Sequence, residues 1–66
     1  MTIEIWIRFD DLELLKTAMA GHVFHIKNHT IKYSTYANVS VASQHCVHIE
    51  YNKFVEMIDN QILIKL

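Results

Sequence analysis

The sequence predicts a small α+β domain in which a single-layer, mostly antiparallel sheet carries two helices on one face. Segments 3–9, 31–41 and 45–51 alternate with the period of two that is typical of half-buried strands, whereas 11–21 and 52–60 show helical spacing. Of the 66 residues, 52% are hydrophobic, and only one glycine and no proline interrupt them. Regular structure is therefore expected almost from end to end. In α+β domains, helices packed on one face of an antiparallel sheet bury its apolar side chains.

The first strand is predicted over residues 3–9, Ile-Glu-Ile-Trp-Ile-Arg-Phe. Its odd positions are all apolar, so they are expected to face the helices. Its even positions are Glu4, Trp6 and Arg8, which are expected on the opposite face. The indole of Trp6 is therefore predicted to lie on the polar face of the sheet, outside the core.

The first helix is predicted over residues 11–21. Asp10 is the expected N-cap, and Glu13, three residues later, completes the pattern of a capping box. Gly21 suits the left-handed residue that ends many helices. The apolar stripe of this helix consists of Leu12, Leu15 and Met19, widened by Leu14 and Ala18.

Residues 22–27 are predicted to form a short strand, with Phe24 and Ile26 on one face and Val23 on the other. A turn is expected over 28–30, where Asn, His and Thr follow one another.

The next segment, 31–41, keeps its alternation for eleven residues, which is long for a strand. It is interpreted either as one bent strand or as two strands that break near 36–38. Ser43 and Gln44 are expected to form the hairpin connection to a further strand over 45–51.

The second helix is predicted to begin at Asn52 as its N-cap and to end at Asn60. Its inward-facing side chains are expected to be Phe54, Val55 and Ile58, with Met57 beside them. Residues 62–66 close the chain as a strand whose inward-facing residues are expected to be Ile62, Ile64 and Leu66.

The predicted element order is β-α-β-β-β-α-β, or β-α-β-β-α-β if the middle segment is one strand. The shorter order is that of ferredoxin-like domains. This likeness concerns a common architecture and covers no functional motif, so it implies no activity.

Composition and charge restrict the function further. Six basic and seven acidic residues give a net charge of −1, so no strong field attracts nucleic acid or anionic lipid. The single cysteine, Cys46, excludes an internal disulfide framework and favours a reducing, cytoplasmic setting. The N-terminus does not have the pattern of a signal peptide, and the apolar runs are far shorter than the ~20 residues of a membrane span. A soluble protein is expected.

Histidine is unusually frequent, and imidazole and thiolate both bind transition metals. On a strand, residues three apart face opposite sides, so His22 and His25 are expected to diverge, as are His45 and His48. Cys46 and His48 do share a face, and a third ligand would have to come from Glu50 or from across the sheet. Because a structural zinc site needs four ligands, no metal or other cofactor is expected. The five histidines are His22, His25, His29, His45 and His48.

Catalysis is not indicated. The chain has no Gly-rich phosphate loop, no Gly-x-Ser-x-Gly and no His-Glu-x-x-His. Side chains two apart on a strand lie ~6–7 Å from each other, too far for His48 to activate Cys46 directly. No catalytic residue is therefore assigned, and the chain is predicted not to be an enzyme.

The polar face of the sheet is the predicted binding surface. A large aromatic ring within such a face is either an interaction anchor or one member of a cross-strand pair with a tyrosine, and the two interpretations are equally weighted. The terminal strand over 62–66 would allow pairing with a second copy if it lies at an edge, so a homodimer is a further candidate assembly. The candidate partner-binding residues are Trp6, Arg8, Tyr36, His48 and Glu50.

Three functions remain open. The first is a protein-binding module, a small inhibitor that covers a functional surface of a protein partner. Phage or mobile-element inhibitors of host defence complexes, such as anti-CRISPR proteins, are similarly short and free of motifs, although no residue is matched. The second is RNA or single-stranded DNA binding, with Trp6 and Tyr33 or Tyr36 stacking on bases; the negative net charge disfavours it. The third is metal binding through the histidines and Cys46.

Overall fold

The computed structural model describes residues 1–37 and 44–66, and this part of the chain follows the order β-α-β-β-α-β. Its strands are β1 (Thr2–Arg8), β2 (Ile31–Ser34), β3 (Gln44–Glu50) and β4 (Leu63–Lys65). Its helices are α1 (Leu12–Met19) and α2 (Tyr51–Asp59), and two short 3-10 helices, η1 and η2, cover Phe9–Asp11 and Val23–Ile26. The predicted α+β class is confirmed. Within these ranges, no helix has the length and apolar character needed to cross a membrane.

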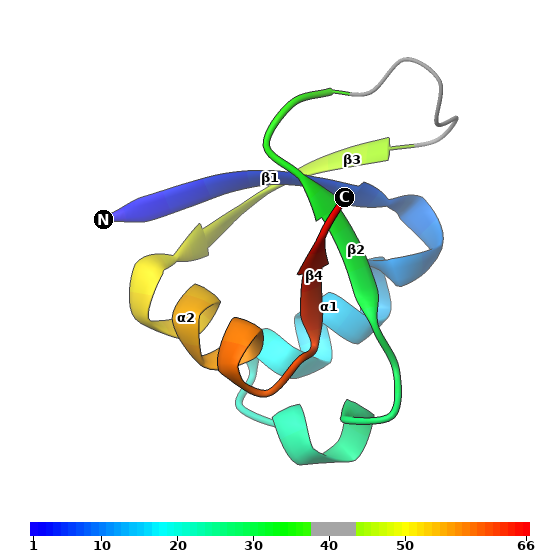
Figure 1. Ribbon diagram of the computed structural model, residues 1–66, viewed down its shortest axis with the longest axis vertical. Coiled ribbons are helices and arrows are strands. Elements are labelled where there is room, and N and C mark those ends of the chain that lie inside the picture. Colours follow the sequence, from blue (N-terminus) through cyan, green and yellow to red (C-terminus); the bar gives the residue numbers. More distant parts are fainter. Residues whose placement is uncertain (38–43) are drawn as a thin grey trace.

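The four strands form one mixed sheet in the order β3-β1-β2-β4. β1 is antiparallel to both of its neighbours, whereas β2 and β4 are parallel. β1 and β3 pair along their whole length, but β1 and β2 pair only at Trp6↔Ser34 and Ile7↔Tyr33. The sheet therefore consists of two ribbons, β1–β3 and β2–β4, which cross where these two pairs join them (Figure 1).

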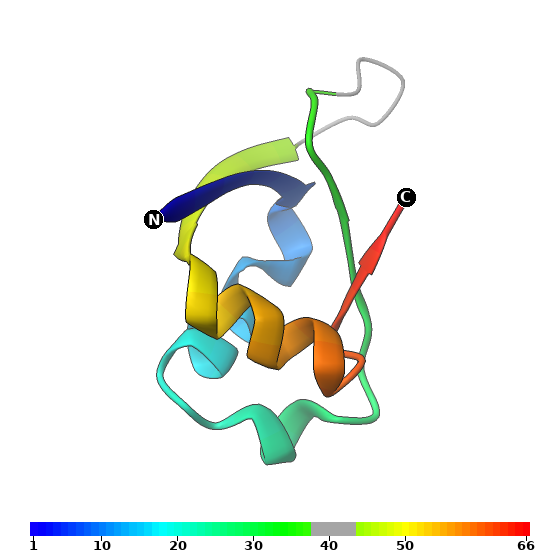
Figure 2. The ribbon, with the colours of Figure 1, turned by 60° about the vertical axis from the view of Figure 1, so that its left-hand side comes forward.

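The prediction of a ferredoxin-like strand arrangement is wrong, although the order of helices and strands along the chain is that of ferredoxin-like domains. A split β-α-β unit has two parallel strands with another strand between them. Here β1 and β2 are direct, antiparallel neighbours. After α1, the segment that contains η2 carries the chain back beneath the sheet before β2 begins, so β2 runs opposite to β1 (Figure 2).

The core lies between the sheet and the two helices, which cover the same face (Figure 1). α1 contributes Leu15 and Ala18, and α2 contributes Met57. Tyr33 of β2 packs edge-on against Phe54 of α2, with ring centroids 5.6 Å apart. The core residues that are fully or almost fully buried are Ile5, Ile7, Leu15, Ala18, Val23, Ile26, Ile31, Tyr33, Ile49, Met57, Ile62 and Leu63.

The prediction of a capping box at the start of α1 is wrong. Asp10 lies in η1, and its carboxylate is 3.6 Å from the guanidinium of Arg8. The amide of Leu12 donates to the carbonyl of Phe9, so the 3-10 helix closes this turn through the backbone and no side chain caps it. At the other end, Gly21 has a φ of 92°, as the sequence predicts for a helix terminus.

The predicted strand over 22–27 is a 3-10 helix instead. Val23 and Ile26 are buried, whereas Phe24 is exposed. A spacing of three places side chains on one side of a 3-10 helix, so Val23 and Ile26 can enter the core together. Alternation with a period of two would have separated them.

β2 is shorter than the predicted strand over 31–41. It ends at Ser34. The hydroxyl of Ser34 donates to the carbonyl of Tyr36 at 2.8 Å and accepts from the backbone amide of Tyr36 at 3.1 Å. This local bonding satisfies the backbone without a strand partner. Residues 38–41 of the predicted segment and Ser43 of the predicted hairpin lie outside the described residues, whereas Gln44 belongs to β3.

The N-cap of the second helix lies two residues before the predicted one. Glu50, not Asn52, is its N-cap, and its carboxylate accepts from the amide of Lys53 at 3.2 Å. Asn60 ends the helix as predicted, and its side-chain amide donates to the carbonyl of Glu56. The central buried residue of α2 is Met57, whereas Phe54, Val55 and Ile58 are only partly buried.

For the last strand, the predicted burial of Ile62 is confirmed, but the predicted inward orientation of Ile64 and Leu66 is wrong. Ile62 and Leu63 are buried, whereas Ile64 and Leu66 are 49% and 60% exposed. Gln61 has a positive φ of 61°, and the chain turns there so that Ile62 enters the core before β4 begins. Leu63 then pairs with Ile31, which also faces the helices.

Replacing Met57 by Ala is expected to lower the free energy of unfolding by about 2–5 kcal/mol, because it opens a cavity under the centre of the sheet. Met19→Ala, the same change at an exposed position of α1, is expected to have a much smaller effect. Urea unfolding followed by the fluorescence of the single tryptophan measures both variants. Equal destabilisation by the two substitutions would contradict the placement of Met57 in the core.

Candidate functional site

The open face is the side of the sheet that carries Glu4, Trp6 and Arg8 and is turned away from α1 and α2. Ile5 and Ile7 of the same strand are fully buried against the helices. Since neighbouring residues of a strand point to opposite sides, the even positions of β1 lie on the other face. The structure thus places Trp6 outside the core, partly exposed, as the alternation predicts.

The neighbours of Trp6 on the adjacent strands are Cys46 of β3 and Ser34 of β2. Both side chains are small. The tyrosine partner considered from the sequence is not found: among the described residues, the indole of Trp6 makes no ring contact with a tyrosine. The interpretation of Trp6 as one half of an aromatic cross-strand pair is therefore wrong.

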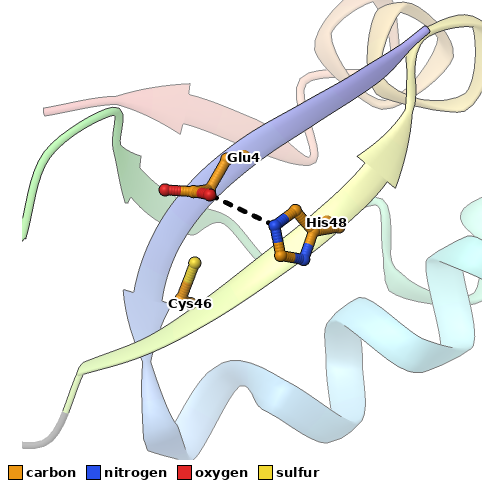
Figure 3. Close-up of side chains that lie close together, drawn as sticks. All are labelled: Glu4, Cys46 and His48. Atoms are coloured by element: carbon orange, nitrogen blue, oxygen red, sulfur yellow. Dashed lines mark hydrogen bonds and ion pairs between the residues drawn. The ribbon is translucent and has the colours of Figure 1, made fainter.

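Next to Trp6, the open face holds a cluster of three side chains, Glu4, Cys46 and His48 (Figure 3). Glu4 and His48 are direct partners in the β1–β3 register, and His48 Nε2 lies 3.1 Å from Glu4 Oε2. Cys46 precedes His48 by two residues and points to the same side. The carboxylate oxygen, the thiol sulfur and the imidazole nitrogen all lie within 4.8 Å of one another.

The environment of Cys46 disfavours the thiolate. Partial burial of the thiol raises its pKa most, and the negative charge of Glu4 and hydrogen bonding to that carboxylate raise it further. Catalytic cysteines need the opposite, a pKa lowered by a neighbouring cation or helix N-terminus. The thiol of Cys46 hydrogen-bonds to the Glu4 carboxylate, which also contacts His48 Nε2, so the hydrogen-bond partner of the thiol is the carboxylate rather than the imidazole.

The other candidate residues have different surroundings. Arg8 is on the open face and forms an exposed ion pair with Asp10. Tyr36 is exposed in the bend that follows β2. Glu50 caps α2, so its carboxylate is turned toward the helix. The structure thus brings Trp6, Arg8 and His48 onto one face, whereas Glu50 has a structural task.

Two expectations about the histidines have different outcomes. His22 and His25 were expected to diverge, but their ring centroids are 5.6 Å apart, because η2 brings residues three apart to one side. His45 and His48 do lie on opposite faces. His45 is the partner of Ile7 and packs edge-on against Phe9, whereas His48 faces Glu4.

Glu4 is the member of the cluster that the sequence did not identify. The possible third ligands for Cys46 and His48 were Glu50 or an unnamed residue across the sheet, and the structure supplies the second. Only the register of β1 on β3 reveals this neighbour. An acidic residue on the polar parity of a strand is the only signal of it in the sequence.

Comparison with known proteins gives no match: no family model fits the sequence, and no curated protein or solved structure is significantly similar to it. The described part of the chain contains no pocket. The function is therefore inferred from the chemistry of the open face.

Alkylation of Cys46 by iodoacetamide at neutral pH is expected to be slower than that of a cysteine in an unstructured peptide, because its raised pKa leaves less thiolate. The rate should rise with pH until the thiol ionises above its ordinary range. Glu4→Gln is expected to accelerate the reaction at neutral pH, since it removes the adjacent negative charge. Mass spectrometry of the folded chain in chelator-containing buffer measures the rates.

The matched control is Glu13→Gln, which removes the same charge from α1, where Glu13 pairs with Lys16 instead. An equal acceleration by both variants would show that overall charge, rather than contact with Glu4, determines the reactivity of Cys46.

Proposed function

We propose that the chain is a non-enzymatic protein-binding module that inhibits its partner by covering a functional surface. The observation that carries this proposal is the position of Trp6 in the middle of the open face, beside two small side chains and away from the helical layer. Tryptophan is among the residues most enriched at the centres of protein interfaces. A ring with no aromatic partner of its own is suited to enter a pocket on another protein.

Two further exposed apolar side chains lie on the same face of the sheet as Trp6. Ile64 lies on the same face, since its partner in the register, Lys32, is on the side opposite to the buried Ile31 and Tyr33. Leu66 follows with the same parity, and its amide donates to the carbonyl of Tyr33. An apolar centre bordered by polar groups is the usual anatomy of a protein interface.

The charges at this face indicate the chemistry of the partner. Lys32 has an exposed side chain on the same face as Trp6, and so has Arg8, which is also in an exposed ion pair with Asp10. A partner that presents an apolar pocket for the indole with carboxylates beside it would match both features. Glu4 and His48 border the other side of Trp6 and pair with each other.

Inhibitors from phages or mobile elements, anti-CRISPR proteins among them, are the class that we propose to test first. The single cysteine is free, which suits action in a reducing, cytoplasmic compartment. The partner is proposed to be a different protein, and pairing of two copies is an alternative outcome of the experiment.

Trp6→Ala is expected to weaken binding to the partner about thirtyfold or more, the loss of a central anchor worth about 2 kcal/mol. The tag-free chain is immobilised in chelator-containing buffer, proteins retained from its native host are identified, and the affinity of each purified candidate is then measured. Support requires that the candidate's own activity is inhibited by the wild type and much less by Trp6→Ala.

The matched control is Phe24→Ala, which removes an exposed aromatic ring from η2, on the helical side of the molecule. This variant should bind like the wild type, and circular dichroism verifies the fold of both. The proposal fails if both variants bind equally. It also fails if the wild type retains only its own copies, or if single-stranded oligonucleotides quench Trp6 at micromolar protein.

A further inference from the structure

We propose that Glu4, Cys46 and His48 form a binding site for a divalent transition metal ion, and that Zn²⁺ fits it best. The proposal rests on the geometry of this cluster and does not depend on the protein-binding role. In the part of the chain that the structure describes, this is the group of His, Cys, Asp or Glu side chains whose ligand atoms converge closely enough to share an ion.

The three donor atoms have the right spacing. Zinc binds sulfur, nitrogen and oxygen ligands at ~2.0–2.3 Å, which places the ligands of a tetrahedral site roughly 3.3–3.8 Å from one another. His48 Nε2 and Glu4 Oε2 are already 3.1 Å apart, and Cys46 Sγ lies within 4.8 Å of both. Small side-chain rotations are enough to bring all three atoms to one ion.

The chemistry of the donors selects the class of metal. A thiolate and an imidazole exclude hard ions such as Ca²⁺ and Mg²⁺, which prefer oxygen ligands. One sulfur, one nitrogen and one oxygen suit Zn²⁺, which accepts all three. When the thiol gives up its proton, the thiolate and the Glu4 carboxylate together balance the two positive charges of the ion.

The backbone fixes the site before any ion binds. Glu4 is on β1, and Cys46 and His48 are on β3, and these strands pair along their whole length. Ligands on paired strands are positioned more precisely than ligands on loops. The side chains of His48 and Glu4 are 64% and 55% exposed, so an ion can enter from solvent and a fourth position stays open to water.

The experiment is a titration of the reduced, tag-free, chelator-treated chain with Co²⁺, a spectroscopic substitute for Zn²⁺. We expect one Co²⁺ per chain, a sulfur-to-cobalt charge-transfer absorption, and loss of that absorption when Zn²⁺ displaces Co²⁺. Cys46→Ser should abolish the charge-transfer absorption. Glu4→Gln and His48→Gln should each weaken binding about tenfold or more, since effects of this size follow even from the loss of outer-shell partners.

His45→Gln is the matched control, because His45 is on the same strand but on the opposite face, against Phe9. Its affinity for Co²⁺ should equal that of the wild type. The proposal is overturned if the wild type shows no charge-transfer absorption, if His45→Gln weakens binding as much as His48→Gln does, or if one ion is bound per two chains. The titration uses the isolated chain, so its failure would leave the protein-binding proposal intact.

Discussion

The pairing of β1 with β3 is the constraint on which both the core and the open face depend. The register runs without interruption from Thr2↔Glu50 to Arg8↔Gln44. It turns Ile5 and Ile7 toward the helices, and the same alternation sets Glu4 opposite His48 and Trp6 opposite Cys46. A slip of one residue would move each side chain of a strand to the other face. The burial of the apolar side chains therefore also determines which polar side chains meet.

The elements that could be predicted are those in which the order of apolar and polar residues shows which side chains face the core. Every odd position of the first strand is a large apolar residue, and Gly21 marks the end of α1 with a positive φ. In the last strand, the orientation predicted for Ile64 is wrong because Ile62, Leu63 and Ile64 are all apolar, so the pattern cannot say which of them is buried. The answer depends on the turn at Gln61 and on the pairing of Leu63 with Ile31, and both are tertiary features.

For the candidate site as well, some features follow from the sequence pattern and others only from the tertiary structure. That Cys46 and His48 share a face follows from their spacing of two, because β3 is a regular strand. That Glu4 joins them, and that Trp6 has a cysteine and a serine rather than a tyrosine beside it, follows only from the order and register of the strands. Sequence periodicity determines the face of a side chain, whereas its neighbours on that face come from distant parts of the chain.

The cluster of Glu4, Cys46 and His48 lies beside Trp6, so an ion bound there would change the charge next to the indole. An exposed pair such as Glu4 and His48 adds little to stability, since solvent screens it, so the fold does not require this arrangement. Without an ion, the cluster carries the single negative charge of Glu4 when His48 is neutral and Cys46 is protonated. With Zn²⁺, the charges of the ion, the carboxylate and the thiolate cancel. The ion would thus remove a negative charge from one side of the indole while Arg8 and Lys32 stay positive on the same face, which strengthens the preference of that face for an acidic partner.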